Sequence, residues 1–135
     1  MRKIVVITAV VCLIAGACVW FILRARRAVK VPLTTVQTFS DSLAKADFDG
    51  AYAFTAPELR ASTSRESFDA VEQHLISEFG KPIRFEAGNI EMEANQYGTH
   101  ETAEGHWVFQ KGQPVFKFDL KYENGRWLIF SFQQR

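Results

Sequence analysis

The feature that most constrains the fold is a run of twenty uncharged residues, Ile4–Leu23. Basic residues flank this run on both sides, two in residues 2–3 and four in residues 24–30. A helix rises about 1.5 Å per residue, so twenty residues span roughly 30 Å, the thickness of a bilayer's hydrocarbon core. We therefore expect residues 4–23 to form a single-pass membrane anchor that contacts the lipid bilayer.

The same segment has two alternative interpretations. A lipoprotein signal would be cut after Ala17 and leave Cys18 first, and a secretory signal would be removed altogether. The apolar run continues past that cut, however, and it exceeds the roughly 7–15 residues of a secretory signal. We favour an uncleaved anchor that begins at Ile4, places Trp20 near the lipid headgroups and ends at Leu23.

The orientation of the anchor follows from two opposing signals. Its flanks carry nearly equal positive charge, and the small excess after the anchor favours a cytoplasmic domain. Its place at the start of the chain resembles that of an export signal and favours the opposite orientation. We expect a protein of the cell (inner or cytoplasmic) membrane whose domain is extracytoplasmic. Cys12 and Cys18 both lie in the anchor and give no information about the redox compartment.

The remaining chain has the length of one domain. We divide the sequence into an anchor with basic flanks, residues 1–30, and a domain, residues 31–135. The domain has ten basic and fifteen acidic residues, a formal charge of −5, although the whole chain is +1. Nucleic-acid binding requires clustered Lys and Arg, so we expect no nucleic-acid partner.

Apolar spacings of three and four predict helices in the first half of the domain. After a short linker, Ala28–Pro32, a first helix is expected over Leu33–Ala46. Asp47 is placed to cap a second, short helix over Phe48–Thr55, and residues 56–59 are expected to break it.

A third helix is predicted after a capping box. Thr63 stands three residues before Glu66, the spacing at which each side chain satisfies a free amide of the other's backbone. Phe68, Val71, Leu75 and Phe79 are predicted on one apolar face of this helix, and Gly80 is expected to end it.

The apolar period changes to two after residue 82, which predicts strands. We expect them over Ile83–Asn95, Thr99–Gln110, Val115–Glu123 and Arg126–Gln133. Asn124-Gly125 favours a two-residue hairpin turn because both residues tolerate positive φ. Two apolar faces are predicted, one in each of the last two strands: Phe116, Phe118, Leu120 and Tyr122 in the third, and Leu128, Phe130 and Phe132 in the fourth.

This order of elements predicts an α+β fold. An N-terminal transmembrane helix is followed by three helices packed on one face of a curved, four-stranded antiparallel sheet, in a cone-like arrangement. Residues 39–52, 57–60 and 66–68 resemble small bacterial proteins of the nuclear transport factor 2-like superfamily, and so does the terminal hairpin, residues 124–129. A weaker resemblance, to the membrane-anchored cytochrome oxidase assembly factors, rests on residues 79–83 and on that hairpin.

The superfamily resemblance implies isomerases, dehydratases or non-enzymes that use the cone as a pocket. An enzyme of this kind needs a carboxylate or a His–Asp pair inside the cone. Glu91, Glu93 and Asp119 alternate with apolar residues, so we place them on the solvated face of the sheet. His74 lies on a helix flank, where a structural role is expected.

Two further histidines, His100 and His106, are an even number of residues apart and share a strand face if the strand is regular. With Glu104 they would form a metal or acid–base cluster, but Gly105 indicates a bulge, and no second ligand group is evident. We expect no catalytic residues, no metal and no cofactor.

Aromatic residues are abundant in the domain, and most of them are expected in its core. An apolar pocket is the alternative for five of them. The pocket-lining candidates are Tyr52, Phe54, Trp107, Phe118 and Tyr122.

The sequence leads to two functional hypotheses. The first is a membrane-tethered, non-catalytic binding or assembly module that presents its domain to a protein partner, with a homodimer as a further possibility. The second is a pocket that binds or modestly transforms a small apolar ligand, as an isomerase or dehydratase would. A purely structural role is a third possibility.

Overall fold

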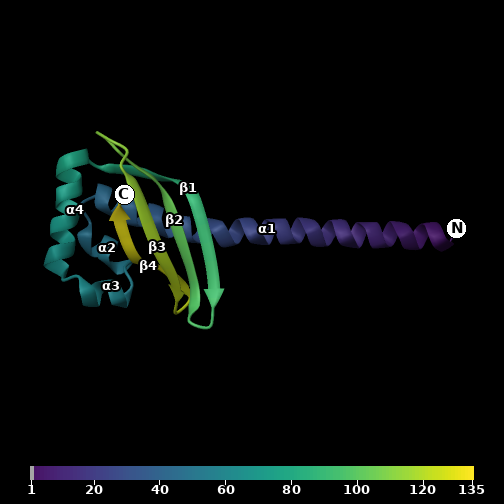
Figure 1. Ribbon diagram of the computed structural model, residues 1–135. Helices are drawn as coiled ribbons and strands as arrows, with labels where there is room; N and C mark the ends of the chain where they lie inside the picture. The colour runs from purple at the N-terminus through teal and green to yellow at the C-terminus, as the bar shows by residue number, and fades with distance from the viewer. Residues whose placement is uncertain (1) are drawn as a thin grey trace. The chain divides into compact units, whose positions relative to one another are not determined.

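The computed structural model describes the backbone of residues 2–135 and the side chains of residues 16–24 and 32–135. The chain separates into two compact units, Met1–Val31 and Pro32–Arg135. Helix α1 (Arg2–Ala44) contains residues of both units (Figure 1). The linker expected at Ala28–Pro32 is therefore wrong. Proline removes one backbone donor, but no glycine lies between residues 17 and 49 to favour a break in the helix.

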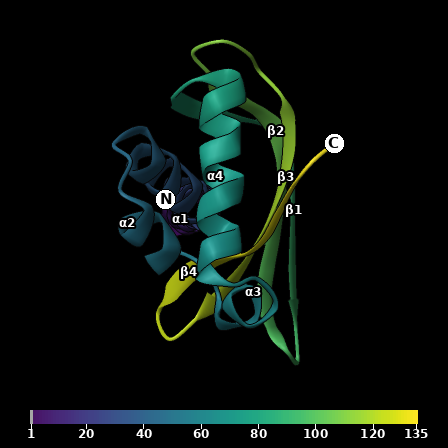
Figure 2. The same ribbon diagram turned by 90° about the vertical axis from the view of Figure 1, so that its left-hand side faces the viewer.

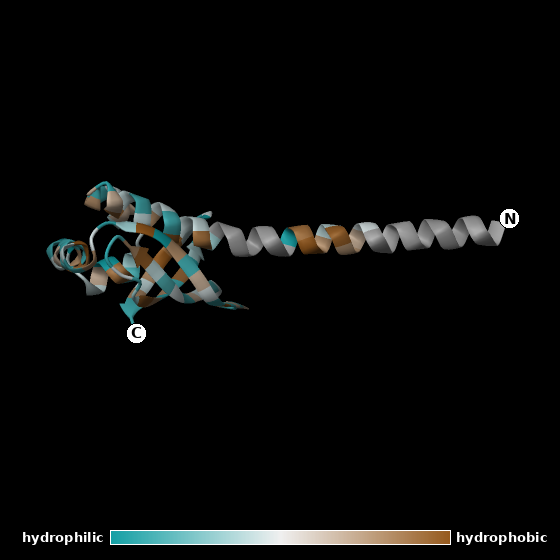
Figure 3. Cartoon of the chain, turned by 90° about the horizontal axis from the view of Figure 1, so that it is seen from above, coloured by the Kyte–Doolittle hydropathy of each residue, from teal (hydrophilic) through white to brown (hydrophobic). Residues whose placement is uncertain are grey.

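The predicted anchor falls largely on residues whose side chains are not described, including Ile4. The described side chains of this segment are mostly hydrophobic, as the brown ribbon of Figure 3 shows, and Trp20 and Leu23 are exposed. Among the described residues, no helix is long and apolar enough to cross a membrane.

Three further helices follow: α2 (Phe48–Ala53), α3 (Pro57–Ser62) and α4 (Arg65–Phe79). The prediction of three helices in the domain is wrong, because α3 forms where a break was expected. Its proline stands at the first helical position, where the missing N–H costs nothing and the fixed φ favours a helix.

The helix caps are partly as predicted. Asp47 accepts a hydrogen bond from the Gly50 N–H (2.8 Å), which confirms the cap of α2. Gly80 ends α4 with a φ of 77°, also as predicted. The N-cap of α4 is Ser64 rather than Thr63, because Thr63 already serves as the C-cap of α3.

Four antiparallel strands form one sheet in the order β1-β2-β3-β4: β1 (Pro82–Asn95), β2 (Gly98–Phe109), β3 (Val115–Glu123) and β4 (Arg126–Gln134). The α+β class and the four-stranded antiparallel sheet are confirmed. Asn124 and Gly125 both have positive φ, 51° and 80°, so the predicted hairpin turn is confirmed as well.

The face assignments hold for β3 but not for β4. In β3, Phe116, Phe118 and Leu120 are buried, as the alternation predicted. In β4 the register shifts opposite Asp119 and Leu120, which inserts one extra residue. The expectation that Leu128, Phe130 and Phe132 share a face is therefore wrong, since Ile129 and Phe132 lie opposite the inward residues of β3.

Figure 2 shows α2 and α4 on the same side of the sheet. The core cluster takes buried side chains from α1, α2, α4 and the sheet. Trp107 of β2 is fully buried and its Nε1 donates to the Ser40 Oγ of α1 (2.9 Å). Phe39 of α1 lies against several rings of the same core. The cluster comprises Val36, Phe39, Leu43, Ala51, Phe68, Leu75, Trp107, Phe109, Phe116, Phe118, Leu120, Trp127 and Ile129.

Candidate binding groove

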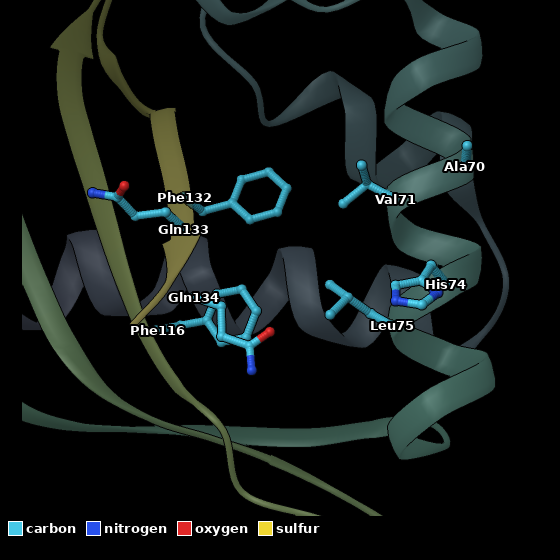
Figure 4. Close-up of a pocket in the computed structure, with 8 residues that line it drawn as sticks. All are labelled: Ala70, Val71, His74, Leu75, Phe116, Phe132, Gln133 and Gln134. Atoms are coloured by element: carbon cyan, nitrogen blue, oxygen red, sulfur yellow. The ribbon is translucent and has the colours of Figure 1, made fainter.

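An apolar groove of about 410 Å³ lies between α4 and the last residues of β4 (Figure 4). Its walls come from elements that are far apart in the sequence. The lining residues are Ala70, Val71, His74, Leu75, Phe116, Phe132, Gln133 and Gln134.

The helical wall follows from the turn angle of α4. Successive helical residues are about 100° apart, so Phe68 and Leu75 share the face that packs on the core. Val71 and His74 lie on one flank of that face. The expectation that Val71 packs on the core with Phe68 and Leu75 is wrong: Val71 remains 47% exposed because it faces open space rather than the core. Figure 4 shows Val71 and Leu75 on one side of the space and Phe132 on the other.

The strand wall depends on the register shift in β4. After the shift, Phe132 pairs with Phe118 and Gln134 with Phe116, so both side chains share the inward face of the sheet. The ring of Phe132 stacks on that of Phe118, with centroids 5.9 Å apart. Without the extra residue, Phe132 would point to the opposite face and the groove would lose this wall.

The polar groups of the groove are a histidine and two amides. His74 Nε2 lies 3.4 Å from Glu78 Oε2, and the His74 side chain is 75% exposed. Gln133 and Gln134 lie on the exposed end of β4. No carboxylate lines the groove. Such a surface suits apolar groups with hydrogen-bonding neighbours.

A buried carboxylate lies on α4 but does not line the groove. Glu72 of α4 is fully buried, and neither of its oxygens has a hydrogen-bond partner among the described residues. Burial raises the pKa of Glu72 to about 8, and the Asp69 carboxylate adds to the rise. The sequence contains a signal for this site, because Glu72 lies four residues after Phe68 and three before Leu75, on the apolar face of the helix.

A second buried carboxylate lies on β2. Glu101 is 1% exposed, and both of its oxygens are without a partner in the described part of the chain. It pairs with Met92 of β1 and Leu120 of β3 on the inward face of the sheet. Burial raises the pKa of Glu101 to about 7.

The structure does not bring the five predicted pocket residues together. Trp107 and Phe118 are fully buried in the core. Tyr52 and Phe54 are partly buried against it, and none of these four lines the groove. Tyr122 is half-exposed and lines a separate polar hollow of about 370 Å³.

The charges in that polar hollow are already paired. Lys121 bonds to Glu58, and its Nζ lies 3.2 Å from Glu123 Oε2. The bond to Glu58 raises the pKa of Lys121 and lowers that of Glu58. We therefore assign the candidate site to the groove.

The predicted ionisable residues of the sheet lie away from the groove. Glu91 and Glu93 are exposed, and Asp119 accepts hydrogen bonds from Thr102 (2.9 Å) and Ser131 (2.7 Å). These three carboxylates are on the face of the sheet opposite the helices, as predicted.

The two strand histidines share that outer face. His100 pairs with Lys121, and the Nδ1 of His106 lies 3.1 Å from the Gln113 carbonyl oxygen. Among the described residues, no three His, Cys, Asp or Glu side chains are grouped closely enough to hold a metal ion. The bulge expected at Gly105 lies in the facing part of β1 instead.

Comparison with protein-family models finds no match for the chain. Comparison with curated proteins likewise finds no match.

Proposed function

We propose that this chain is a membrane-tethered, non-catalytic binding module whose partner occupies the groove between α4 and β4. The groove is the observation that carries the proposal. It is apolar, it is open to solvent, and its lining contains no carboxylate. An exposed apolar groove rimmed by polar groups is typical of a recognition site.

The tether rests on the sequence. Ile4–Leu23 has the length and composition of a membrane span and is flanked by basic residues. We propose a single pass through the cell membrane with the domain outside the cytoplasm. The resemblance to the nuclear transport factor 2-like superfamily, whose members use the space between helices and sheet, supports a binding role for this side of the sheet.

A small apolar ligand is the second candidate occupant. A volume of about 410 Å³ falls within the roughly 300–1,000 Å³ of small-molecule sites. His74, Gln133 and Gln134 would hydrogen-bond the polar end of such a ligand. A protein segment and a small molecule would thus use the same walls.

The test compares two aspartate substitutions on α4. Val71→Asp places a charge in the groove, whereas Ser77→Asp places the same charge at an exposed position outside the groove lining, about 120° around the helix from Val71. Membranes carrying the full chain are washed with alkaline carbonate and extracted in mild detergent, and the complexes are weighed by native mass spectrometry.

We expect the chain to stay with the membranes through the wash. A protein partner, or a second copy, should remain bound to the wild type and Ser77→Asp and fall at least tenfold with Val71→Asp. A stoichiometric small molecule that stays bound to the wild type and Ser77→Asp but is lost from Val71→Asp would favour the small-ligand candidate. Equal binding to all three chains would overturn the groove as the site, and release of the chain in the wash would overturn the tether.

A further inference from the structure

The outer edge of β4 already accepts one extended segment of this chain. Ile129 donates its N–H to the Phe54 carbonyl (2.8 Å) and accepts from the Ala56 N–H (2.8 Å). Thr55 forms a parallel bridge with Ile129 through these bonds. Residues 54–56 therefore cover β4 at this point like a short additional strand.

Beyond Ile129 the same edge has free backbone groups. Arg135 donates its N–H to the Val115 carbonyl of β3 (2.9 Å). Backbone groups alternate in direction along an antiparallel strand, so Gln133 also faces β3 while Phe132 and Gln134 face outward. In the described part of the chain, no other strand lies beyond β4, and no hydrogen bond satisfies these outward groups.

This free edge borders the groove. The side chains of Phe132 and Gln134 line it, opposite Val71 and Leu75 of α4. Residues 130–134 carry no charge. Charged side chains normally prevent an edge strand from pairing with another chain, and this part of β4 lacks them.

We infer that the edge of β4 at Phe132–Gln134 binds an extended peptide segment as a fifth strand, with alternate side chains of that segment in the groove. The backbone of the segment bonds to Phe132 and Gln134, as residues 54–56 bond to Ile129. Side chains two residues apart lie on the same face of a strand, about 7 Å from each other. Alternate apolar residues of the segment therefore enter the groove together.

The acidic residues near the groove indicate which side chains should flank the apolar residues of the bound segment. Ala70 lines the groove and also an adjoining hollow that contains Arg65, Glu66 and Asp69, where Arg65 pairs with Asp69 (2.8 Å). Glu78 lies beside His74 at the groove. The domain as a whole has a formal charge of −5. We expect the segment to carry Lys or Arg next to its apolar residues. This inference rests on the proposed function, since it names the partner of the same groove.

The test compares two substitutions of Gln134. Gln134→Pro removes the outward N–H, which β3 does not use, so an edge strand tolerates it. Gln134→Ala removes the side chain and keeps the N–H. Phage-displayed random heptapeptides are selected on the full wild-type chain in lipid nanodiscs. The affinity of the selected peptides is then measured for the wild type, both variants and Val71→Asp.

We expect selected peptides with alternating apolar residues and flanking Lys or Arg. They should bind Gln134→Ala more weakly than the wild type, because its side chain lines the groove, and Gln134→Pro at least tenfold more weakly than Gln134→Ala, since one buried backbone bond is lost as well. The amides of Phe132 and Gln134 should become protected from hydrogen exchange when the peptide binds. Thermal unfolding of both variants should match the wild type, as for other exposed substitutions.

Two outcomes would overturn the strand addition while leaving the groove in place. One is equal binding to Gln134→Pro and Gln134→Ala with loss of binding to Val71→Asp, which would assign recognition to side chains alone. The other is a failure to select peptides while the neutral dye N-phenyl-1-naphthylamine binds in the groove. If the full chain forms a dimer and Gln134→Pro dissociates it, the occupant of the β4 edge is a second copy of the chain rather than a peptide. Peptides that bind Val71→Asp normally would contradict the proposed function as well.

Discussion

The two edge strands of the sheet are protected in different ways. β1 carries exposed glutamates at 91 and 93, has two register shifts against β2, and is bound along its edge by the Gln37 side chain of α1. β4 has an uncharged final stretch, residues 130–134, and the described contacts cover its edge at Ile129. Charges and bulges prevent an edge from pairing with another chain, so the β1 side is closed and the β4 side is available.

The helices next to the two edge strands differ in the same way. On the closed side, α1 is joined to the sheet by hydrogen bonds from Gln37 to β1 and by the bond between Trp107 and Ser40. On the open side, α4 borders the groove, and its buried Glu72 has no hydrogen-bond partner among the described residues. The β1 side of the domain is joined to α1 by the hydrogen bonds of Gln37, whereas the β4 side contains an open groove. A binding site is expected on the less constrained side.

The largest expected effect concerns Glu72 on the open side. Its pKa is raised from 4.5 to about 8, so the folded state holds the proton more tightly than the unfolded state. The contribution of Glu72 to the free energy of unfolding is therefore fully present below pH 4.5 and is lost as the pH rises toward 8. The loss is on the order of 4 kcal/mol. Glu72→Gln should remove most of this loss, measured by urea unfolding of the full chain in micelles between pH 5 and pH 8.

Two further variants isolate this effect. Glu101→Gln should flatten the dependence of the free energy of unfolding on pH mainly below pH 7, because the pKa of Glu101 is about 7. Gln73→Ala, at an exposed uncharged position of the same helix as Glu72, is the control and should leave the dependence of stability on pH unchanged. A wild-type curve that is flat between pH 5 and pH 8 would show that Glu72 is not held as the structure describes.

The next effect concerns the closed side, where β1 approaches Gly105 of β2. A Cβ at Gly105 would lie 2.0 Å from the Glu86 carbonyl oxygen. Gly105→Ala should therefore separate β1 from β2 and destabilise the domain by about 3 kcal/mol. Gly88→Ala is the matched control, because its Cβ would meet only the Glu104 carbonyl oxygen at 3.7 Å. Equal urea midpoints for the two variants would contradict the close approach of these strands.

The smallest effect concerns the edge of β1. Gln37 donates to the Ile83 carbonyl (3.2 Å) and accepts from the Phe85 N–H (3.3 Å). Gln37→Ala should lower the free energy of unfolding by about 1 kcal/mol and speed hydrogen exchange at Phe85. Gln73→Ala, at an exposed position of α4, is the control and should change neither quantity. An unaltered Phe85 exchange rate would mean that Gln37 does not protect this edge.

The sequence by itself determined the features that depend on neighbouring residues. The alternation in β3, the Asn124-Gly125 turn, the Asp47 cap and the end of α4 at Gly80 were all predicted correctly. Each follows from backbone preferences or from hydrogen bonds within a few residues, which are visible in the local sequence. The four strands and their antiparallel order followed from the same local signals together with short turns.

The tertiary structure alone decided the groove. The register shift in β4 put Ile129 and Phe132 on the face toward α4, whereas local alternation had grouped Phe132 with Leu128 and Phe130. The burial of Glu72 and the close approach at Gly105 likewise depend on what lies across from them. Register and free volume are set by pairing between segments that are distant in the sequence, whereas periodicity reports only which residues share a side of one segment. The sequence therefore determined the elements, and their packing determined where an open site could form.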